Sequence, residues 1–328
     1  MAESKQLDPS KLKAFENAAA GHDGVMSDPS GELIIKPCTK AEIDFYQQTT
    51  TDRPDFAELM PTFMGTLQLG APAEAADVTA ASESPEITQA TKDQQLKHGL
   101  KLETETAIVL ENLEHGFKQP NVLDLKLGAR LYAEGTKPEK AARLDKVASE
   151  TTSGSLNFRI AGMKVWNGQS FDIYDKFYGR KFDAQNVKDG FSTFFAGLDH
   201  GASPEQAQEL LETILAEITK ARQLLERNES RMYSASVLIV YEGDNDALKT
   251  LMSGGDDKTP KADERAPKQS EIQKSVDEEE DEDEEDPPTA FRVKMIDFAQ
   301  YVPLDMLVAK GEAILTIAQR CLDTWTRP

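Results

Sequence analysis

The pattern of apolar and polar residues predicts strands over most of the chain. Short runs that are apolar, or that alternate apolar with polar residues, are typical of strands. Such runs occur at Glu32–Lys36, Met60–Leu69, Thr104–Leu113, Pro120–Gly128, Arg159–Trp166, Met232–Tyr241 and Phe291–Phe298. The sequence therefore predicts strands in both halves of the protein.

Helical periodicity is clearest in one long segment. Between Pro204 and Arg227, leucine and isoleucine recur at helical spacing, and proline is well suited to the first position of a helix. Shorter helices are expected from Ala41 onward and near Pro138–Ala148, and a closing helix over Leu304–Trp325. Helices thus dominate the second half of the chain.

Length and composition are sufficient for two lobes. The chain has 328 residues, of which 39% are hydrophobic, and it can bury a substantial core. Residues 1–112 predict a small β-rich N-lobe, with a flexible loop at about 71–95 that is rich in Ala, Ser and Glu. Residues 113–328 predict a larger C-lobe of strands and helices. The expected fold class is α+β.

The formal net charge of −21 is unevenly distributed. An unbroken acidic run of ten residues, Asp277–Asp286, carries almost half of it. Self-repulsion and the lack of apolar residues predict a disordered insertion at about 244–289. Local basic clusters elsewhere can still bind phosphates, so the net charge does not exclude a polyanionic ligand.

Two isolated cysteines, Cys38 and Cys321, favour a reducing compartment over a disulfide scaffold. No apolar run reaches membrane-spanning length, and the polar N-terminus lacks the core of a signal peptide. The protein is expected in the nucleus and cytoplasm, as a monomer that binds no nucleic acid directly.

The most informative segment is Pro120–Gly128, in which Asp124 and Lys126 are two residues apart within an apolar run. Alternate side chains of a strand share a face, so the acid and the base point together into one site. The flanking apolar residues supply buried packing. A structural ion pair is the alternative interpretation of these two residues.

Four blocks in the same order carry a resemblance to a known family. They are Pro-x-x-x-Asp-x-Lys-x-Gly at 120–128, the block 153–163, the segments 235–238 and 241–243 taken together, and Ile-Asp-Phe-Ala at 296–299. The chain resembles the inositol polyphosphate kinases from about Gly31 to its C-terminus, and most of all the fungal multikinases. The resemblance implies a two-lobed fold, similar to protein kinases and SAICAR synthase, with ATP in a cleft between the lobes.

The resemblance also implies residues that bind ATP. Lys36, at a strand end, would reach the phosphates and be held by an ion pair with Glu42 on the next helix. Glu111 and Leu113 lie where the lobes join and would border the adenine. The alternatives are a solvated lysine at a strand edge and an ordinary strand end that enters a turn.

Asp124 would contact the nucleotide ribose or lie beside the reaction centre, and Lys126 would contact the acceptor and the transferring phosphate. Asp297 is the candidate ligand for Mg²⁺, because carboxylate oxygen is its preferred protein ligand. An isolated Ile-Asp-Phe, however, often merely marks a strand end. At Ala235-Ser236 the chain lacks the first serine of the family's Ser-Ser-Leu-Leu block, which puts the role of that hydroxyl in doubt.

Several cations are needed to bind an inositol phosphate. Lys140, Arg143 and Lys146 are spaced by three in a short segment at about 136–152, and Lys176 matches another substrate position of the family. Gln300 stands where relatives often have histidine; it can donate a hydrogen bond but carries no charge. A solvated helix face is the alternative for the basic residues on 138–148.

The short segment between Gly128 and Ser153 favours a permissive multikinase within this family. The activity that the resemblance implies is ATP- and Mg²⁺-dependent phosphorylation of inositol 1,4,5-trisphosphate at its 3- and 6-hydroxyls, which gives tetrakis- and pentakisphosphate. An inositol hexakisphosphate kinase that makes pyrophosphates is the nearest rival. A different class of function, a nuclear protein whose acidic run binds transcription factors, remains open and is compatible with kinase activity.

Overall fold

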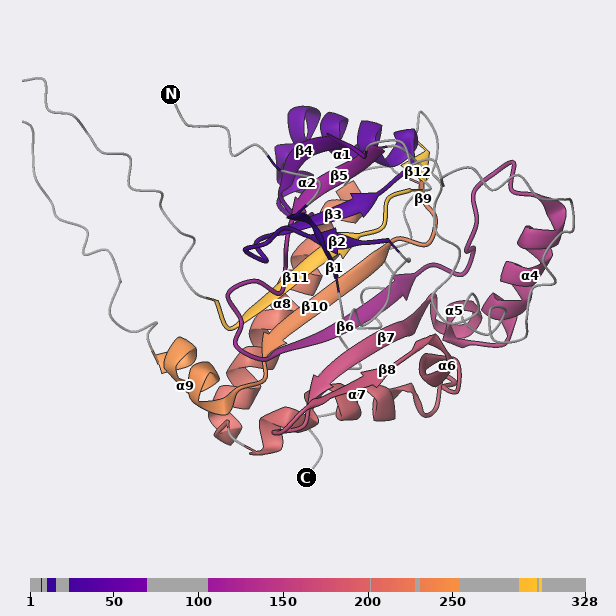
Figure 1. The fold of residues 1–328 in the computed structure, drawn as a ribbon. Helices are drawn as coiled ribbons and strands as arrows, with labels where there is room; N and C mark the ends of the chain where they lie inside the picture. Colours follow the sequence, from indigo (N-terminus) through magenta and orange to yellow (C-terminus); the bar gives the residue numbers. More distant parts are fainter. Residues whose placement is uncertain are drawn as a thin grey trace, which may run out of the picture.

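A computed structural model describes residue 7 and residues 11–15, 24–69, 106–200, 202–227, 231–253, 289–299 and 301–302. Two five-stranded antiparallel sheets form the framework of an α+β fold (Figure 1). The predicted loop at 71–95, the acidic run, the helix Leu304–Trp325 and Gln300 lie outside the described residues. No helix in the described ranges is long and apolar enough to span a membrane.

The first sheet belongs to the N-lobe and has the strand order β1-β2-β3-β5-β4. Its strands are β1 Lys13–Ala14, β2 Met26–Ser27, β3 Leu33–Pro37, β4 Phe63–Gln68 and β5 Thr106–Glu111. Helix α1, Lys40–Asp52, follows β3 directly and begins at the N-cap Thr39, whose side chain accepts a hydrogen bond from the backbone of Glu42. A short helix, α2 Pro54–Ala57, follows it.

The second sheet forms the centre of the C-lobe and has the order β11-β10-β6-β7-β8. Its strands are β6 Pro120–Leu127, β7 Phe158–Trp166, β8 Phe171–Tyr174, β10 Ser236–Glu242 and β11 Phe291–Ile296. The central strand β6 is the predicted signature strand.

Helices surround this second sheet. They are α4 Pro138–Ser149, α5 Thr152–Leu156, α6 Lys176–Gly179, α7 Val187–Phe195, a 3-10 helix Ala196–His200, α8 Pro204–Arg227 and α9 Asn245–Ser253. Figure 1 shows that α4 stands apart from both sheets. The small strands β9 Arg231–Met232 and β12 Tyr301–Val302 pair with each other.

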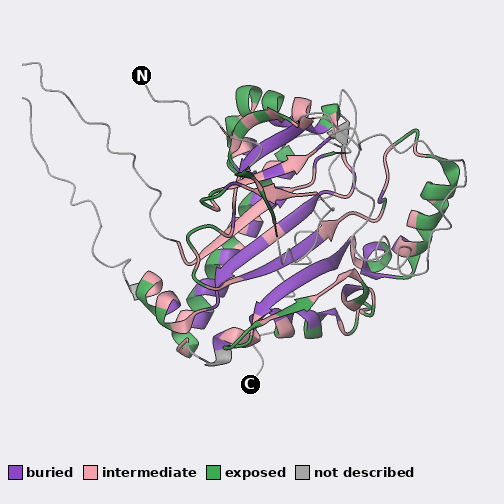
Figure 2. Cartoon of the chain, in the orientation of Figure 1, coloured by how far each residue is buried: buried purple, intermediate pink, exposed green. Residues whose placement is uncertain are grey.

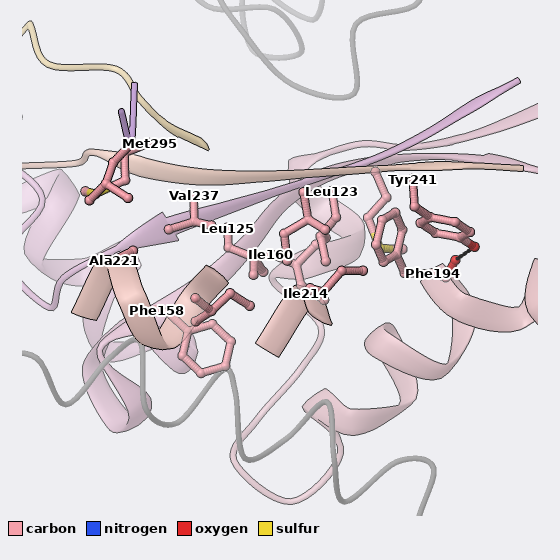
Figure 3. Packing of buried hydrophobic residues seen from close by; sticks show 14 of the residues in the cluster. Leu123, Leu125, Phe158, Ile160, Phe194, Ile214, Ala221, Val237, Tyr241 and Met295 are labelled. Atoms are coloured by element: carbon pink, nitrogen blue, oxygen red, sulfur yellow. Dashed lines mark hydrogen bonds between the residues drawn. The ribbon is translucent and has the colours of Figure 1, made fainter. Parts of the chain in front are cut away.

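One face of the C-lobe sheet is the core of the protein. Figure 3 shows Leu123, Leu125, Ile160 and Val237 facing Ile214 of α8, and all five are at most 1% exposed. Burial is therefore concentrated along the sheet strands, as Figure 2 shows. Because side chains alternate along a strand, the neighbouring residues of these strands project from the opposite face.

The two lobes are joined by contacts as well as by the chain. Phe298, which follows β11, stacks on Phe45 of α1 with ring centroids 4.3 Å apart and also meets Tyr46 edge-on. The backbone N–H of Met295 donates to the carbonyl of Leu59 over 2.6 Å. A C-lobe strand end is therefore anchored in the N-lobe.

Two predictions about elements need correction. The segment from Asp244 was expected to be disordered, but Asn245–Ser253 forms helix α9, because Leu248 packs into the core. A single strand was expected over Met232–Tyr241, but β9 and β10 are separate, and the chain bends at Ser234, whose φ is 59°.

Candidate active site

The polar face of the C-lobe sheet carries the signature residues. Ser236 of β10 and Arg159 of β7 pair with Lys126 from either side, so the three side chains form a row across the sheet. Asp124 lies one step further along β6 on the same face. The predicted acid and base therefore do project together, opposite the apolar core.

Next to Asp124, this same face becomes apolar. A small cluster separate from the main core is made of buried Leu113, Val122 and Val240, with Phe117, Leu238 and Ile296 packed against it. Leu113 belongs to the connection between the lobes. An apolar floor at the lobe junction is suited to the flat face of a nucleotide base.

The connection between the lobes is fastened on both sides. Asn112 donates from its side-chain Nδ2 to the Gly31 carbonyl of the N-lobe over 2.7 Å. Arg292 of β11 donates to the carbonyls of Leu113 at 3.0 Å and His115 at 2.6 Å. These bonds fix the backbone beside the apolar floor, so this edge of the site is preorganised.

Glu111, the other residue predicted at this junction, ends β5. Its backbone N–H donates to the carbonyl of Thr62 at 3.0 Å, and its carboxylate accepts from the Thr62 hydroxyl at 2.8 Å. The Glu111 side chain thus bonds within the N-lobe, and Leu113 alone of the two contributes a side chain to the apolar floor.

Lys36 joins the N-lobe to the candidate metal ligand. Its Nζ lies 2.7 Å from Glu42 Oε1, the ion pair that was predicted, and 2.8 Å from Asp297 Oδ1. Burial alone would lower the pKa of Lys36, but the carboxylates of Asp297 and Glu42 hold this pKa well above its usual value. Lys36 is therefore a fixed positive charge at the interface of the lobes.

Lys126 reaches the same carboxylate from the C-lobe. Its Nζ lies 3.3 Å from Asp297 Oδ2 and donates to the Ser234 carbonyl at 2.9 Å. Asp297 therefore lies between two lysines, one from each lobe. We call Lys36, Glu42, Lys126 and Asp297 the interlobe charge network.

Asp124 is held in an environment that disfavours its charge. It is 4% exposed, and its Oδ1 atom has no hydrogen-bond partner. Burial raises the pKa of Asp124 above its ordinary value, against the opposing effect of the Lys126 ammonium. The Ser236 hydroxyl on the adjacent strand is also buried; it lowers the pKa of Asp124 but makes no hydrogen bond of ordinary geometry. Buried polar atoms on neighbouring strands that lack well-formed hydrogen bonds are typical of a site that a ligand completes.

A basic cluster lies on the side of Lys126 where Arg159 stands. It combines Arg143 of α4, Arg159 of β7, Lys176 of α6 and Arg180, which directly follows α6. Burial and the charge of Arg180 lower the pKa of Arg159 to about 10. Burial and neighbouring positive charge likewise lower the pKa of Lys176 and of Arg180, with only Asp175 opposing them. Cations that repel one another in this way are suited to binding a polyanion.

Comparison with known proteins shows which family the chain belongs to. The sequence profile of the inositol polyphosphate kinase family matches residues 107–313. The inositol polyphosphate multikinase of Saccharomyces cerevisiae is 34% identical over 268 residues, which cover 73% of this chain and 75% of that protein. The chain belongs to the inositol polyphosphate kinase family. It is a kinase, and hence a phosphotransferase that acts on inositol phosphates.

Other members of the inositol polyphosphate kinase family show the same relationship. The multikinase of Schizosaccharomyces pombe is 31% identical over 235 residues, covering 71% of this chain and 80% of that protein. The crystal structure of inositol phosphate multikinase Ipk2 from S. cerevisiae, in complex with ADP and Mn²⁺, superposes with a TM-score of 0.62 at 25% identity. It covers 89% of this chain and 99% of that one, so the two-lobed α+β fold is confirmed.

Two members of the basic cluster were not predicted from the kinase sequence. Arg159 and Arg180 lie within blocks that resemble the family, but neither was assigned a role. Arg159 pairs with Lys126 across the strands, and Arg180 lies close enough to Arg143 for that charge to lower its pKa. The pairing of Lys126 with an arginine on the next strand would have indicated this cluster. The register between two strands, however, cannot be read from the sequence of one strand.

The predicted cations on α4 divide into two groups in this kinase. Lys140, Arg143 and Lys146 are all exposed. Arg143 is close enough to Lys176 and Arg180 to lower their pKa values, whereas Lys146 lies 3.8 Å from Glu150 on the same helix. Tyr132 donates to Asp145 over 3.0 Å and ties the helix to the segment that precedes it. Arg143 therefore joins the basic cluster from an exposed position on α4.

The carboxylates of this kinase fit Mg²⁺ shared with a nucleotide. In the described part of the chain, no group of three or more His, Cys, Asp or Glu side chains could hold a metal by itself. Mg²⁺ is typically bound by one or two carboxylates and the phosphates of its nucleotide, and retains waters. Asp297, together with the unpaired Oδ1 atom of Asp124, provides that donor set.

Proposed function

We propose that this protein is an ATP- and Mg²⁺-dependent inositol polyphosphate multikinase that phosphorylates inositol 1,4,5-trisphosphate at its 3- and 6-hydroxyls. The products are tetrakis- and pentakisphosphate. The observation that carries the proposal is the interlobe charge network, which places two lysines and a carboxylate between an apolar floor and a basic cluster. This order matches the base, phosphates and acceptor of a phosphoryl transfer.

The arrangement supports a proposed position for each part of ATP. The base lies on the apolar floor beside Leu113, and Asp124 accepts a hydrogen bond from the ribose or lies beside the reaction centre. The phosphates then lie at Lys36, Lys126 and Asp297. Mg²⁺, held by Asp297, supplies charge neutralisation between the ATP phosphates.

The protein contributes mainly position and electrostatics to this reaction. Lys36 is kept charged by Glu42 and neutralises the phosphates of ATP. Lys126 contacts both the transferring phosphate and the acceptor, and neutralises the charge that develops between them. The acceptor hydroxyl attacks the γ-phosphate in line, with the phosphates of the inositol held by Arg143, Arg159, Lys176 and Arg180.

A permissive acceptor site is supported by the segment between β6 and β7. It contains only α4 and α5, and α4 stands apart from both sheets (Figure 1). Such a segment leaves room for an inositol to bind in more than one orientation, which phosphorylation of two hydroxyls requires. The two fungal relatives that match over most of their length are multikinases.

The test is an assay of the purified protein with Mg²⁺ and ATP, with inositol trisphosphate and hexakisphosphate as separate acceptors. Products are resolved by phosphate number and position. Conversion of the trisphosphate to tetrakis- and pentakisphosphate is expected. Pyrophosphate made mainly from the hexakisphosphate would instead identify a hexakisphosphate kinase.

A further inference from the structure

Backbone strain lies next to Lys126. Among the described residues, three that are not glycine have a positive φ: Asn157 at 58°, Ser234 at 59° and Asp297 at 68°. A left-handed conformation costs such residues roughly 1–2 kcal/mol. It persists where the surroundings impose it, and such residues cluster at functional sites.

Ser234 makes two contacts that its conformation sets. Its carbonyl oxygen accepts from Lys126 Nζ at 2.9 Å, and its hydroxyl donates to the carbonyl of Leu131 at 2.9 Å. The next residue, Ala235, accepts from the backbone N–H of Leu127 at 2.8 Å. The strand β6 is thus fixed on one side of Ser234, while its own carbonyl points toward the lysine ammonium.

The carbonyl direction depends on the backbone angles of this one residue. In an ordinary extended conformation, Ser234 would continue β10, and its carbonyl would lie in the plane of the sheet. The left-handed turn instead interrupts the strand between β9 and β10 and aims the oxygen at Lys126. A residue that cannot adopt positive φ would withdraw this oxygen without changing any charged group.

We infer that Ser234 is a positioning residue for phosphoryl transfer, whose left-handed backbone holds the Lys126 ammonium at the reacting phosphate. This inference rests on the proposed role of Lys126. Of the two oxygens that hold the ammonium, that of Asp297 belongs to the candidate metal ligand. The Ser234 carbonyl therefore keeps Lys126 in place when Asp297 binds the metal instead of the lysine.

The test compares four substitutions in the full-length protein. Ser234→Val disfavours positive φ, whereas Ser234→Gly and Ser234→Asn both permit it. We expect Ser234→Val to lower kcat on the order of 100-fold with an unchanged KM for ATP, because a small displacement of a catalytic group has effects of that size. The Gly and Asn variants should retain kcat near that of the wild type. Equal kcat for Val and Gly would overturn the inference.

Ser234→Thr, the fourth substitution, covers the case in which the valine variant does not fold. Thr keeps a hydroxyl, but its branched Cβ disfavours positive φ. A lower kcat for Thr than for Gly supports the backbone role. The same kcat for both would contradict it.

Gly168→Val is the matched control for strain alone. Gly168 has a φ of 93° in the turn between β7 and β8, and a Cβ there meets no atom within 4 Å. This variant should unfold at a lower temperature but keep its kcat. If kcat falls as it does in Ser234→Val, the effect is general strain and the inference fails.

Lys126→Met separates the inference from the proposed function. If this variant turns over normally, the proposed role of Lys126 is wrong whatever Ser234 does. If it is impaired, adding Ser234→Val should reduce the residual rate no further, because both changes remove one function. An additional loss in the double variant would show that Ser234 acts independently of Lys126.

Discussion

Lys36 and Asp297 form an ion pair 2.8 Å long although they are 261 positions apart in the chain. One belongs to the N-lobe sheet and the other follows the last strand of the C-lobe sheet. Glu42 on α1 holds Lys36, and Phe298, the neighbour of Asp297, packs against α1. The position of this helix therefore determines where both partners of the ion pair lie. The geometry of the site therefore depends on how the lobes pack.

Lys36→Met should abolish kinase activity and also destabilise the fold. Glu42 is only 1% exposed, and without Lys36 its carboxylate is left buried without its counter-charge. Breaking a buried pair on one side costs about 3–5 kcal/mol. Urea denaturation measures the free energy of unfolding.

The double variant Lys36→Met with Glu42→Gln is the control, because it removes both charges. It should recover most of the stability and none of the activity. An inactive, fully stable Lys36→Met variant would mean that the buried Glu42 carboxylate does not need Lys36 as its counter-charge in the folded state.

Asp124→Asn should inactivate the enzyme yet raise its free energy of unfolding at pH 7. Burial raises the pKa of Asp124 above 3.8, so the folded protein binds this proton more tightly than the unfolded chain does. Ionisation of the carboxyl therefore costs stability as the pH rises through its folded-state pKa. The amide has no charge to bury.

The stability gain of Asp124→Asn should depend on pH. It should be present at neutral pH and be lost as the pH falls below 3.8, because wild-type Asp124 becomes protonated in both states there. Denaturation of both proteins at several pH values measures this. A variant that is less stable than the wild type at pH 7 would show that the Lys126 and Arg159 charges outweigh burial.

Arg180→Ala should weaken acceptor binding without affecting ATP. A hydrogen bond to a charged group is worth about 1.5–3 kcal/mol, which corresponds to a rise of roughly 10- to 100-fold in the KM for inositol trisphosphate. Steady-state kinetics with each substrate varied in turn separates the two constants. Lys40→Ala, an exposed lysine paired with Asp44, is the control and should change neither.

Phe298→Ala should destabilise the protein by about 3–5 kcal/mol, the usual cost of truncating a buried aromatic residue. Phe298 is 1% exposed and packs against Phe45, Tyr46 and Phe56. Met64→Ala, at a residue 58% exposed, should have almost no effect. If the unfolding temperature falls by the same amount in the two variants, Phe298 does not anchor the lobes.

Much of the fold followed from local patterns. The strand and helix periods place β3, β5, β6, β7, α4 and α8 within a few residues of their observed bounds. The Lys36–Glu42 ion pair was predicted from the family resemblance, and it joins a strand end to the start of the next helix. Such features depend on neighbours along the chain.

The remaining features depend on tertiary pairing. Asp297 meets Lys36 and Lys126 only because the lobes pack together, and Arg159 meets Lys126 only through the register of β6 and β7. The break at Ser234 was missed because an apolar run carries no sign of a left-handed residue. The disordered insertion was predicted to begin too early, at about residue 244. The charged residues that follow α9 made the apolar face of this helix hard to recognise in the sequence.

The most direct test of the account is the rate of phosphoryl transfer from ATP to inositol trisphosphate by the wild type and by Lys126→Met, with thermal unfolding measured in parallel. Removing a preorganised charge at the reacting phosphate should lower kcat by roughly 100- to 1,000-fold. The unfolding temperature should stay close to that of the wild type. A Lys126→Met protein that phosphorylates inositol trisphosphate at the wild-type rate would contradict the account.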